Sequence, residues 1–181
     1  MARSVTGSFW LTEALQQSAG GLVQGTIDLG AYVDVGAQQG IAIEEVDFIW
    51  QRLDTATGYY DSALNAAMTG NASFNGQLTD LNPGNAVVRA DNNTLVASGV
   101  LFLDDANNVA TMGPDVYPDT YGKLDEARMV VNDQLYFTSD IAGTVAANNE
   151  IVCVARIKAR IVKLSTKDWM SIAIQSTAAD N

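Results

Sequence analysis

The sequence predicts a mainly β protein, an antiparallel sandwich of two sheets with short helices near both termini. Apolar and polar residues alternate over residues 23–33 and 151–164, which is the period of a half-buried strand. Turn signals such as Asn82-Pro83-Gly84 separate about eight β-segments. Hydrophobic residues make up 48% of the 181 residues and charged residues only 17%, which is enough to bury the core of a single domain over 1–181.

The chain is expected to begin with an arm or a helix, residues 1–20. Residues 9–17 are interpreted as a short helix or an anchoring arm, which the small residues from Ser18 to Gly21 end. The apolar side chains of this segment are costly to leave in water, so we expect them to contact a neighbouring subunit. They are Phe9, Trp10, Leu11 and Leu15.

Two strands are expected next. Alternation from Val23 to Val33 predicts the first, and apolar residues over 41–50 predict the second. In the second strand the alternation slips at Glu44-Glu45, which predicts a β-bulge or a break at that point.

The middle of the chain is expected to contain a short helix and several more strands. Asp61 is a candidate N-cap for a helix over 61–68, and Gly70 lies just beyond its end. Further strands are expected over residues 72–79, 85–89, 94–103, 128–131, 134–139 and 151–164.

Residues 104–127 are expected to form one long loop, because Pro114 and Pro118 interrupt any regular pattern. Loops of this length in compact domains usually serve function or contact a neighbour. Tyr117 and Tyr121 are therefore candidate anchors on another subunit, although packing over their own sheet is the commoner outcome.

The last predicted strand, 151–164, has one continuous apolar face. Its opposite face carries a basic stripe, defined as Arg156, Lys158 and Arg160. This stripe could face solvent, nucleic acid, lipid headgroups or acidic patches on a sister subunit, and we expect the last of these. A capping-box pattern from Ser165 to Asp168 then predicts a helix over 165–175, with Trp169 and Ile172 on its apolar side.

Charge is distributed unevenly along the chain. The net charge is −11, made of −14 over residues 1–150 and +3 over residues 151–181. An acidic protein lacks the cationic footprint that phosphate recognition needs, so we expect no direct sequence-specific binding of nucleic acid. The basic end and the acidic body are instead complementary. They could attract each other across identical subunits, or the last strand could simply lie beside acidic neighbours in its own fold.

Several residue classes needed for catalysis are missing. The chain contains no histidine, which excludes a Ser-His-Asp triad, a Cys-His dyad and a histidine-ligated zinc site. The lone Cys153 excludes an intrachain disulfide and lies in an apolar strand, where a buried structural thiol is expected. No P-loop, dinucleotide-binding or EF-hand motif is present. We therefore expect no enzymatic activity.

Carboxylate clusters leave two weaker alternatives. Glu44, Glu45 and Asp47 form one cluster, and paired carboxylates can hydrolyse glycosidic bonds when their pKa values differ. The second cluster offers hard oxygen ligands in a loop, which suit calcium. Its candidate ligands are Asp104, Asp105 and Asn107.

About eight β-segments, terminal helices and one long loop together resemble the single jelly-roll capsid proteins of icosahedral viruses. Within that group the chain looks most like the small major capsid subunits of membrane-containing archaeal and thermophilic bacterial viruses. The resemblance implies an eight-stranded jelly roll standing in a capsomer, with arms and loops that bridge neighbouring subunits.

The resulting hypothesis is a self-assembling structural subunit, a viral capsid protein located in the virion. Its expected partners are copies of itself, with a second capsid protein and peripheral contact with an inner membrane as further candidates. The amino terminus lacks a long apolar stretch, so no signal peptide is expected. The alternative hypothesis is a carbohydrate- or calcium-dependent β-sandwich binding module, which would expose Trp or Tyr side chains together on one face.

Overall fold

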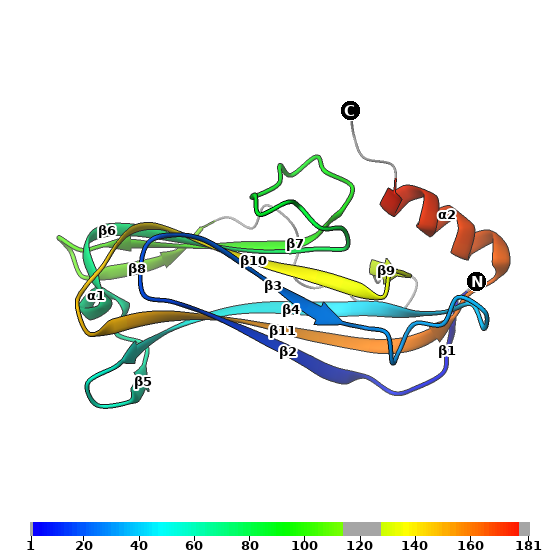
Figure 1. The fold of residues 1–181 in the computed structure, drawn as a ribbon, viewed down its shortest axis with the longest axis horizontal. Helices are drawn as coiled ribbons and strands as arrows, with labels where there is room; N and C mark the ends of the chain where they lie inside the picture. The colour runs from blue at the N-terminus through cyan, green and yellow to red at the C-terminus, as the bar shows by residue number, and fades with distance from the viewer. Residues whose placement is uncertain (1, 114–127, 178–181) are drawn as a thin grey trace.

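A computed structural model describes residues 2–113 and 128–177 and shows two β-sheets packed face to face (Figure 1). The expected mainly β sandwich with antiparallel sheets is therefore confirmed.

The first sheet is built around two long central strands. β4 (Gln39–Asp54) and β11 (Asn149–Lys163) pair antiparallel along their whole length. β1 (Arg3–Ser4) and β2 (Phe9–Gln17) pair with the other side of β11, while β5 (Tyr59–Asp61) and β9 (Arg128–Val130) pair with the other side of β4.

The second sheet has five strands in the order β3, β10, β6, β7, β8, all antiparallel. Their bounds are Gly21–Asp28 for β3, Gln134–Val145 for β10, Met68–Thr79 for β6, Leu95–Asp104 for β7 and Val109–Met112 for β8.

Eight of these strands form nested pairs. β2 pairs with β11, β3 with β10, β4 with β9, and β6 with β7. The first of the eight therefore pairs with the last, the second with the seventh, and so on inward. A long hairpin rolled in this way into two four-stranded sheets is a jelly roll, so the chain's own strand pairing gives it this fold.

The slip in alternation at Glu44-Glu45 is a β-bulge, as the sequence predicted. Lys158 of β11 lies opposite Glu45, but the next residue, Ala159, lies opposite Ile43. Glu44 is thus the extra residue on β4. Because of this extra residue, Ile43 and Val46 both face the core and are fully buried.

The core lies between the sheets and is centred on aromatic side chains. The ring of Phe48 lies 5.9 Å from that of Phe137, centroid to centroid. A Cβ at Gly76 would lie 2.7 Å from the Phe48 ring, and one at Gly99 would lie 3.1 Å from it. These two glycines therefore provide the space that the Phe48 side chain occupies.

The predicted carboxy-terminal helix is present as α2 (Thr166–Thr177). The Ser165 hydroxyl donates to the Asp168 carboxylate at 2.8 Å and accepts the Asp168 backbone N–H at 3.2 Å, which is the expected capping arrangement. Trp169 is buried against Val162 and Leu164, and Ile172 packs on the same small cluster. The apolar side of α2 is therefore covered by its own chain.

Three local predictions are wrong. The helix alternative for residues 9–17 fails because they form the strand β2, while the anchoring arm stays a prediction. The helix expected over 61–68 is confined to α1 (Leu64–Ala67), because Asp61 still belongs to β5 and Met68 begins β6. Residues 85–89 form no strand, although the structure describes all of them.

Candidate subunit-contact surface

The basic stripe lies on the outer face of the first sheet. Arg156, Lys158 and Arg160 alternate along β11 with Ile157 and Ala159, which are fully buried. The three cations therefore share one face, as the sequence predicted.

Two of these cations are paired with acids of the neighbouring strand β4. Lys158 Nζ lies 3.7 Å from Glu45 Oε2, and the Arg160 guanidinium contacts the Glu44 carboxylate. The Ser8 hydroxyl donates to Glu44 at 2.7 Å and accepts from Arg160 at 3.3 Å. Glu44 and Arg160 thus form a largely buried network within one chain.

The third cation lies over an exposed aromatic ring. The Arg156 guanidinium carbon is 4.7 Å from the centre of a Trp10 ring, and Lys158 Nζ is 5.9 Å from it. This is cation–π geometry. Trp10 remains 43% exposed and Arg156 is exposed as well, so this pair is accessible to solvent.

The other amino-terminal candidates point inward. Phe9, Leu11 and Leu15 lie on the inner side of β2, and the last two pack against the main core. The Phe9 ring lies 5.3 Å from Tyr32. Trp169 and Ile172 are likewise covered, whereas Tyr117 and Tyr121 lie outside the described residues.

The loop carboxylates are used within their own turn. Asp104 accepts hydrogen bonds from the backbone N–H and the side-chain amide of Asn107, at 3.3 and 2.6 Å. The described part of the chain holds no group of three or more His, Cys, Asp or Glu side chains that could bind a metal ion. Calcium at Asp104, Asp105 and Asn107 remains a prediction.

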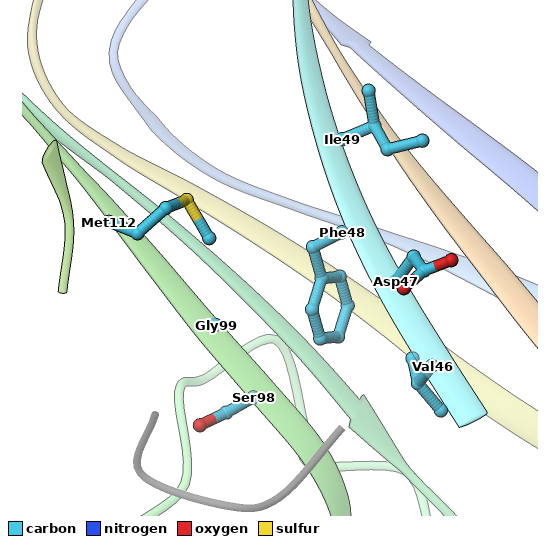
Figure 2. A pocket seen from close by; sticks show the side chains of 7 residues that line it. All are labelled: Val46, Asp47, Phe48, Ile49, Ser98, Gly99 and Met112. Carbon is cyan, nitrogen blue, oxygen red and sulfur yellow. The ribbon is translucent and has the colours of Figure 1, made fainter. Parts of the chain in front are cut away.

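A cavity of about 240 Å³ opens between β4 and β7 (Figure 2). Val46, Phe48 and Met112 contribute apolar side chains to its lining, and among the described residues only Asp47 adds an ionisable group. A single carboxylate provides neither the paired acids of a glycosidase nor a metal site.

A hairpin of β4 and β5 presents two exposed tyrosines that were not among the predicted contact residues. Tyr59 is 73% exposed and Tyr60 is 57% exposed. Consecutive residues of a strand point to opposite faces, so the two rings do not form one aromatic surface. The turn signal Thr57-Gly58 before two tyrosines could have identified this hairpin.

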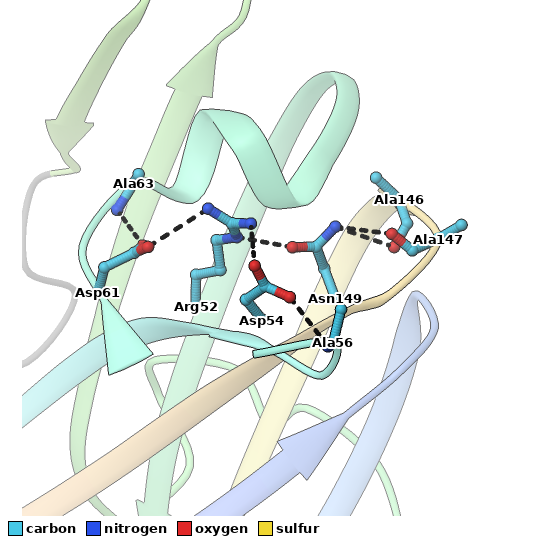
Figure 3. A network of polar contacts seen from close by, with 8 residues as sticks. All are labelled: Arg52, Asp54, Ala56, Asp61, Ala63, Ala146, Ala147 and Asn149. Carbon is cyan, nitrogen blue, oxygen red and sulfur yellow. Dashed lines mark hydrogen bonds and ion pairs between the residues drawn. The ribbon is translucent and has the colours of Figure 1, made fainter. Parts of the chain in front are cut away.

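Arg52 anchors the base of this hairpin (Figure 3). Its guanidinium binds Asp61 at 3.3 Å, Asp54 at 3.4 Å and the Asn149 side-chain oxygen at 2.6 Å. A hydrogen bond from the Ala56 backbone N–H is the main cause that lowers the pKa of Asp54. The hairpin is therefore held in place while its tyrosines stay accessible.

The edge of the second sheet is also apolar and exposed. Phe102, Val109 and Met112, on β7 and β8, are each about half exposed. β8 was not predicted, because its four residues fall within the expected loop 104–127.

A loop over residues 81–94 covers part of the outer face of the second sheet. The Gln77 side-chain amide donates to the Val88 carbonyl at 3.0 Å and accepts the Val88 N–H at 2.9 Å. At the start of this loop Arg128 contacts the buried Asp80 carboxylate at 3.3 Å. Burial raises the pKa of Asp80 to about 6, although Arg128 opposes the shift.

The expected buried thiol is confirmed. Cys153 is fully buried in the core, and burial raises its pKa to about 12, despite an opposing hydrogen bond with Ser139.

None of the described helices is long and apolar enough to cross a membrane.

No sequence-family model matches this chain, and neither does any curated protein sequence. Its structure is similar to Merkel cell polyomavirus VP1 in complex with disialyllactose (7% identity, TM-score 0.45, covering 90% of this chain and 98% of that one). It is also similar to trichodysplasia spinulosa-associated polyomavirus VP1 in complex with GM1 oligosaccharide (9% identity, TM-score 0.42, covering 89% and 98%). A third similar structure is the triple jelly-roll fold of an archaeal virus (10% identity, TM-score 0.39, covering 90% of this chain and 30% of that one).

Proposed function

We propose that this chain is a structural subunit that assembles with copies of itself into the icosahedral shell of a virus. One observation carries the proposal: in the described part of the chain, exposed apolar side chains occur in groups on three separate elements of the jelly roll. They are Tyr59 and Tyr60 on β5, Phe102, Val109 and Met112 at the β7–β8 edge, and Met170 and Ile174 on α2.

These three groups lie toward opposite ends of the molecule. Figure 1 shows β5 and β8 at one end of the long axis and α2 at the other. Leaving apolar area in water costs about 25 cal/mol per Å², and exposed apolar groups on a folded domain mark contact surfaces. A subunit of a closed shell meets several neighbours through different surfaces, which this distribution allows.

The charge distribution supports the same function. The basic stripe is largely matched within the chain, so its member that is most accessible to a neighbour is Arg156, which lies over the Trp10 ring. The proposal keeps the virion as the location and copies of the chain as the first partners. A second capsid protein and an inner membrane remain further candidate partners.

Among the residues that the structure describes, no observation supports the alternative of a carbohydrate-binding module. Such a module requires aromatic side chains exposed together on one face. Tyr59 and Tyr60 instead occupy consecutive positions of one strand, which point in opposite directions.

Native mass spectrometry with electron microscopy of the purified chain tests the proposal. We expect discrete particles of many copies, and we expect the double variant Tyr59→Ser/Tyr60→Ser to lose them while keeping the thermal unfolding of the parent. Val87→Ser, which also removes an exposed apolar side chain, is the matched control and should keep the particles. A parent chain that remains monomeric at every concentration would refute the proposal.

A further inference from the structure

The edge strand β8 has an unusual composition for an exposed edge. Its sequence is Val109-Ala110-Thr111-Met112, all four residues are exposed, and β8 is the last strand of its sheet. Among the described edge strands of both sheets, β8 alone has no charged residue. The others carry Arg3 in β1, Glu13 in β2, Asp28 in β3, Asp61 in β5 and Arg128 in β9.

Charged residues on edge strands are a common protection against pairing with another chain. Glu13 shows this protection clearly, because it lies on the inward side of β2, where a second copy would have to bury its charge. β8 lacks such protection, and in a chain of net charge −11 it offers an uncharged strip where two copies can approach.

The backbone of β8 also has hydrogen-bonding groups available. The Gly113 N–H donates to the Val100 carbonyl at 2.7 Å, which makes these two residues a hydrogen-bonded pair. Such pairs alternate along an antiparallel ladder, so Thr111 and Val109 direct their N–H and C=O groups toward β7. Ala110 and Met112 direct theirs toward the open edge.

We propose that β8 pairs antiparallel with β8 of a second copy about a two-fold axis perpendicular to the sheet, with Thr111 opposite the partner's Thr111. This register places Ala110 opposite the partner's Met112, and Met112 opposite the partner's Ala110. Ala110 and Met112 then both exchange backbone hydrogen bonds with the partner strand. A shift of the register by one residue would lose these bonds, unless one strand turned over and placed its side chains on the wrong face.

The side chains suit this register. A small Ala110 faces a large Met112, and the Thr111 pair is a favourable cross-strand pair. The acid Asp104 lies opposite Val109 on β7. In the proposed register Asp104 and the partner's Asp104 are four residue positions apart along the strands. Four positions are about 14 Å, which exceeds the Debye length of about 8 Å at physiological ionic strength.

This inference deepens the proposed function and rests on it for its biological meaning, since a short edge contact is useful when a shell repeats it many times. Disulfide trapping tests it, because the native Cys153 is buried and leaves an engineered thiol as the reactive one. In the proposed register residue 111 is a non-hydrogen-bonded pair about 4.5 Å apart between Cα atoms, which a disulfide can bridge. Residue 110 and its counterpart would lie roughly 8 Å apart, which a disulfide cannot bridge.

The full chains Thr111→Cys, Ala110→Cys and Thr26→Cys are oxidised over a concentration series and separated without reductant. Thr26 is the matched control, an exposed threonine on the outer face of β3. We expect covalent dimers of Thr111→Cys to form at least ten times faster than those of the other two. Equal rates, or faster dimers from Ala110→Cys, would overturn the pairing.

A second variant pair covers the case in which the cysteine disturbs the strand. Thr111→Glu places two like charges opposite each other and should weaken self-association at least tenfold relative to Thr26→Glu, and an equal effect would overturn the pairing. Particles that form without a Thr111→Cys crosslink would overturn the edge contact and leave the shell function intact. Crosslinked dimers without larger species would support the edge contact and refute the shell function.

Discussion

The outer face of β11 and the edge strand β8 are both surfaces of one acidic chain, but they differ in how their charges are arranged. On β11 the basic side chains Lys158 and Arg160 are paired with Glu45 and Glu44 of the neighbouring strand. On β8 there is no charge to pair, and Val109 and Met112 are exposed to solvent. Positive charge on an acidic chain is therefore not by itself a surface for partners, because the fold can neutralise it first.

The largest expected effect concerns the buried member of the β11 network. The Glu44 side chain is 8% exposed and that of Arg160 is 28% exposed. Glu44→Gln leaves the Arg160 charge partly buried without a counter-charge, so we expect a loss of about 3 kcal/mol in the free energy of unfolding. Urea denaturation of the variant and the parent measures it.

Glu45→Gln is the matched control for that measurement. Glu45 and Lys158 are 33% and 39% exposed and lie 3.7 Å apart, so we expect a loss below about 1 kcal/mol. Equal losses for the two variants would mean that the pair of Glu44 and Arg160 contributes no more to the free energy of unfolding than an ordinary surface pair.

A second buried acid, Asp80, also lies beside an arginine and sharpens the comparison. Burial raises the pKa of Asp80 from 3.8 to about 6, with Arg128 opposing. A pKa that is higher in the folded state means that the folded chain binds this proton more tightly. The contribution of Asp80 to stability is therefore greatest below about pH 4 and is lost as the pH rises through about 6.

The corresponding measurement compares the parent with Asp80→Asn at several pH values. We expect the free energy of unfolding of the parent, relative to the variant, to fall by about 2 kcal/mol between pH 4 and pH 7. A difference that is constant over this range, or that grows with pH, would contradict the assigned pKa.

The smallest effect is expected on β8. Met112 is 56% exposed, so Met112→Gln should change the free energy of unfolding by less than about 0.5 kcal/mol. The same variant should still weaken self-association, because it replaces an apolar side chain at the proposed edge contact. A destabilisation comparable to that of Glu44→Gln would show that β8 serves folding and not contact.

Strands were predictable where the alternation is long and where both faces differ in polarity. The bulge at Glu44 was predictable for the same reason, since one extra residue in a strand reverses the parity of the alternation beyond it. Of the two alternatives for residues 9–17, the helix is wrong because Glu13, Ala14 and Leu15 favour a helix only locally. Their strand conformation depends on pairing with β11, which is distant in sequence.

The candidate site was less predictable than the fold. The basic stripe was visible in the sequence, but its partners depend on the register between β4 and β11, which places Glu45 opposite Lys158. Residues 85–89 have the composition of a strand, yet the Gln77 side chain satisfies the backbone of Val88 in place of a neighbouring strand. The pairing of the basic stripe and the conformation of residues 85–89 both depend on contacts between residues that are distant in sequence, so no local pattern could predict them.

The central position of β11 has a consequence for how this chain is made. β11 is synthesised long after β1, β2 and β4, yet it pairs with all three of these strands. Until β11 has been synthesised, the first sheet lacks the strand that joins β2 to β4, and the apolar side of β4 is not yet part of a complete sheet. Contacts this distant in sequence close slowly, and the growing chain exposes apolar surface in the meantime. The first sheet can therefore be completed only after β11 has been synthesised, and this step must precede any contact that requires the finished sandwich.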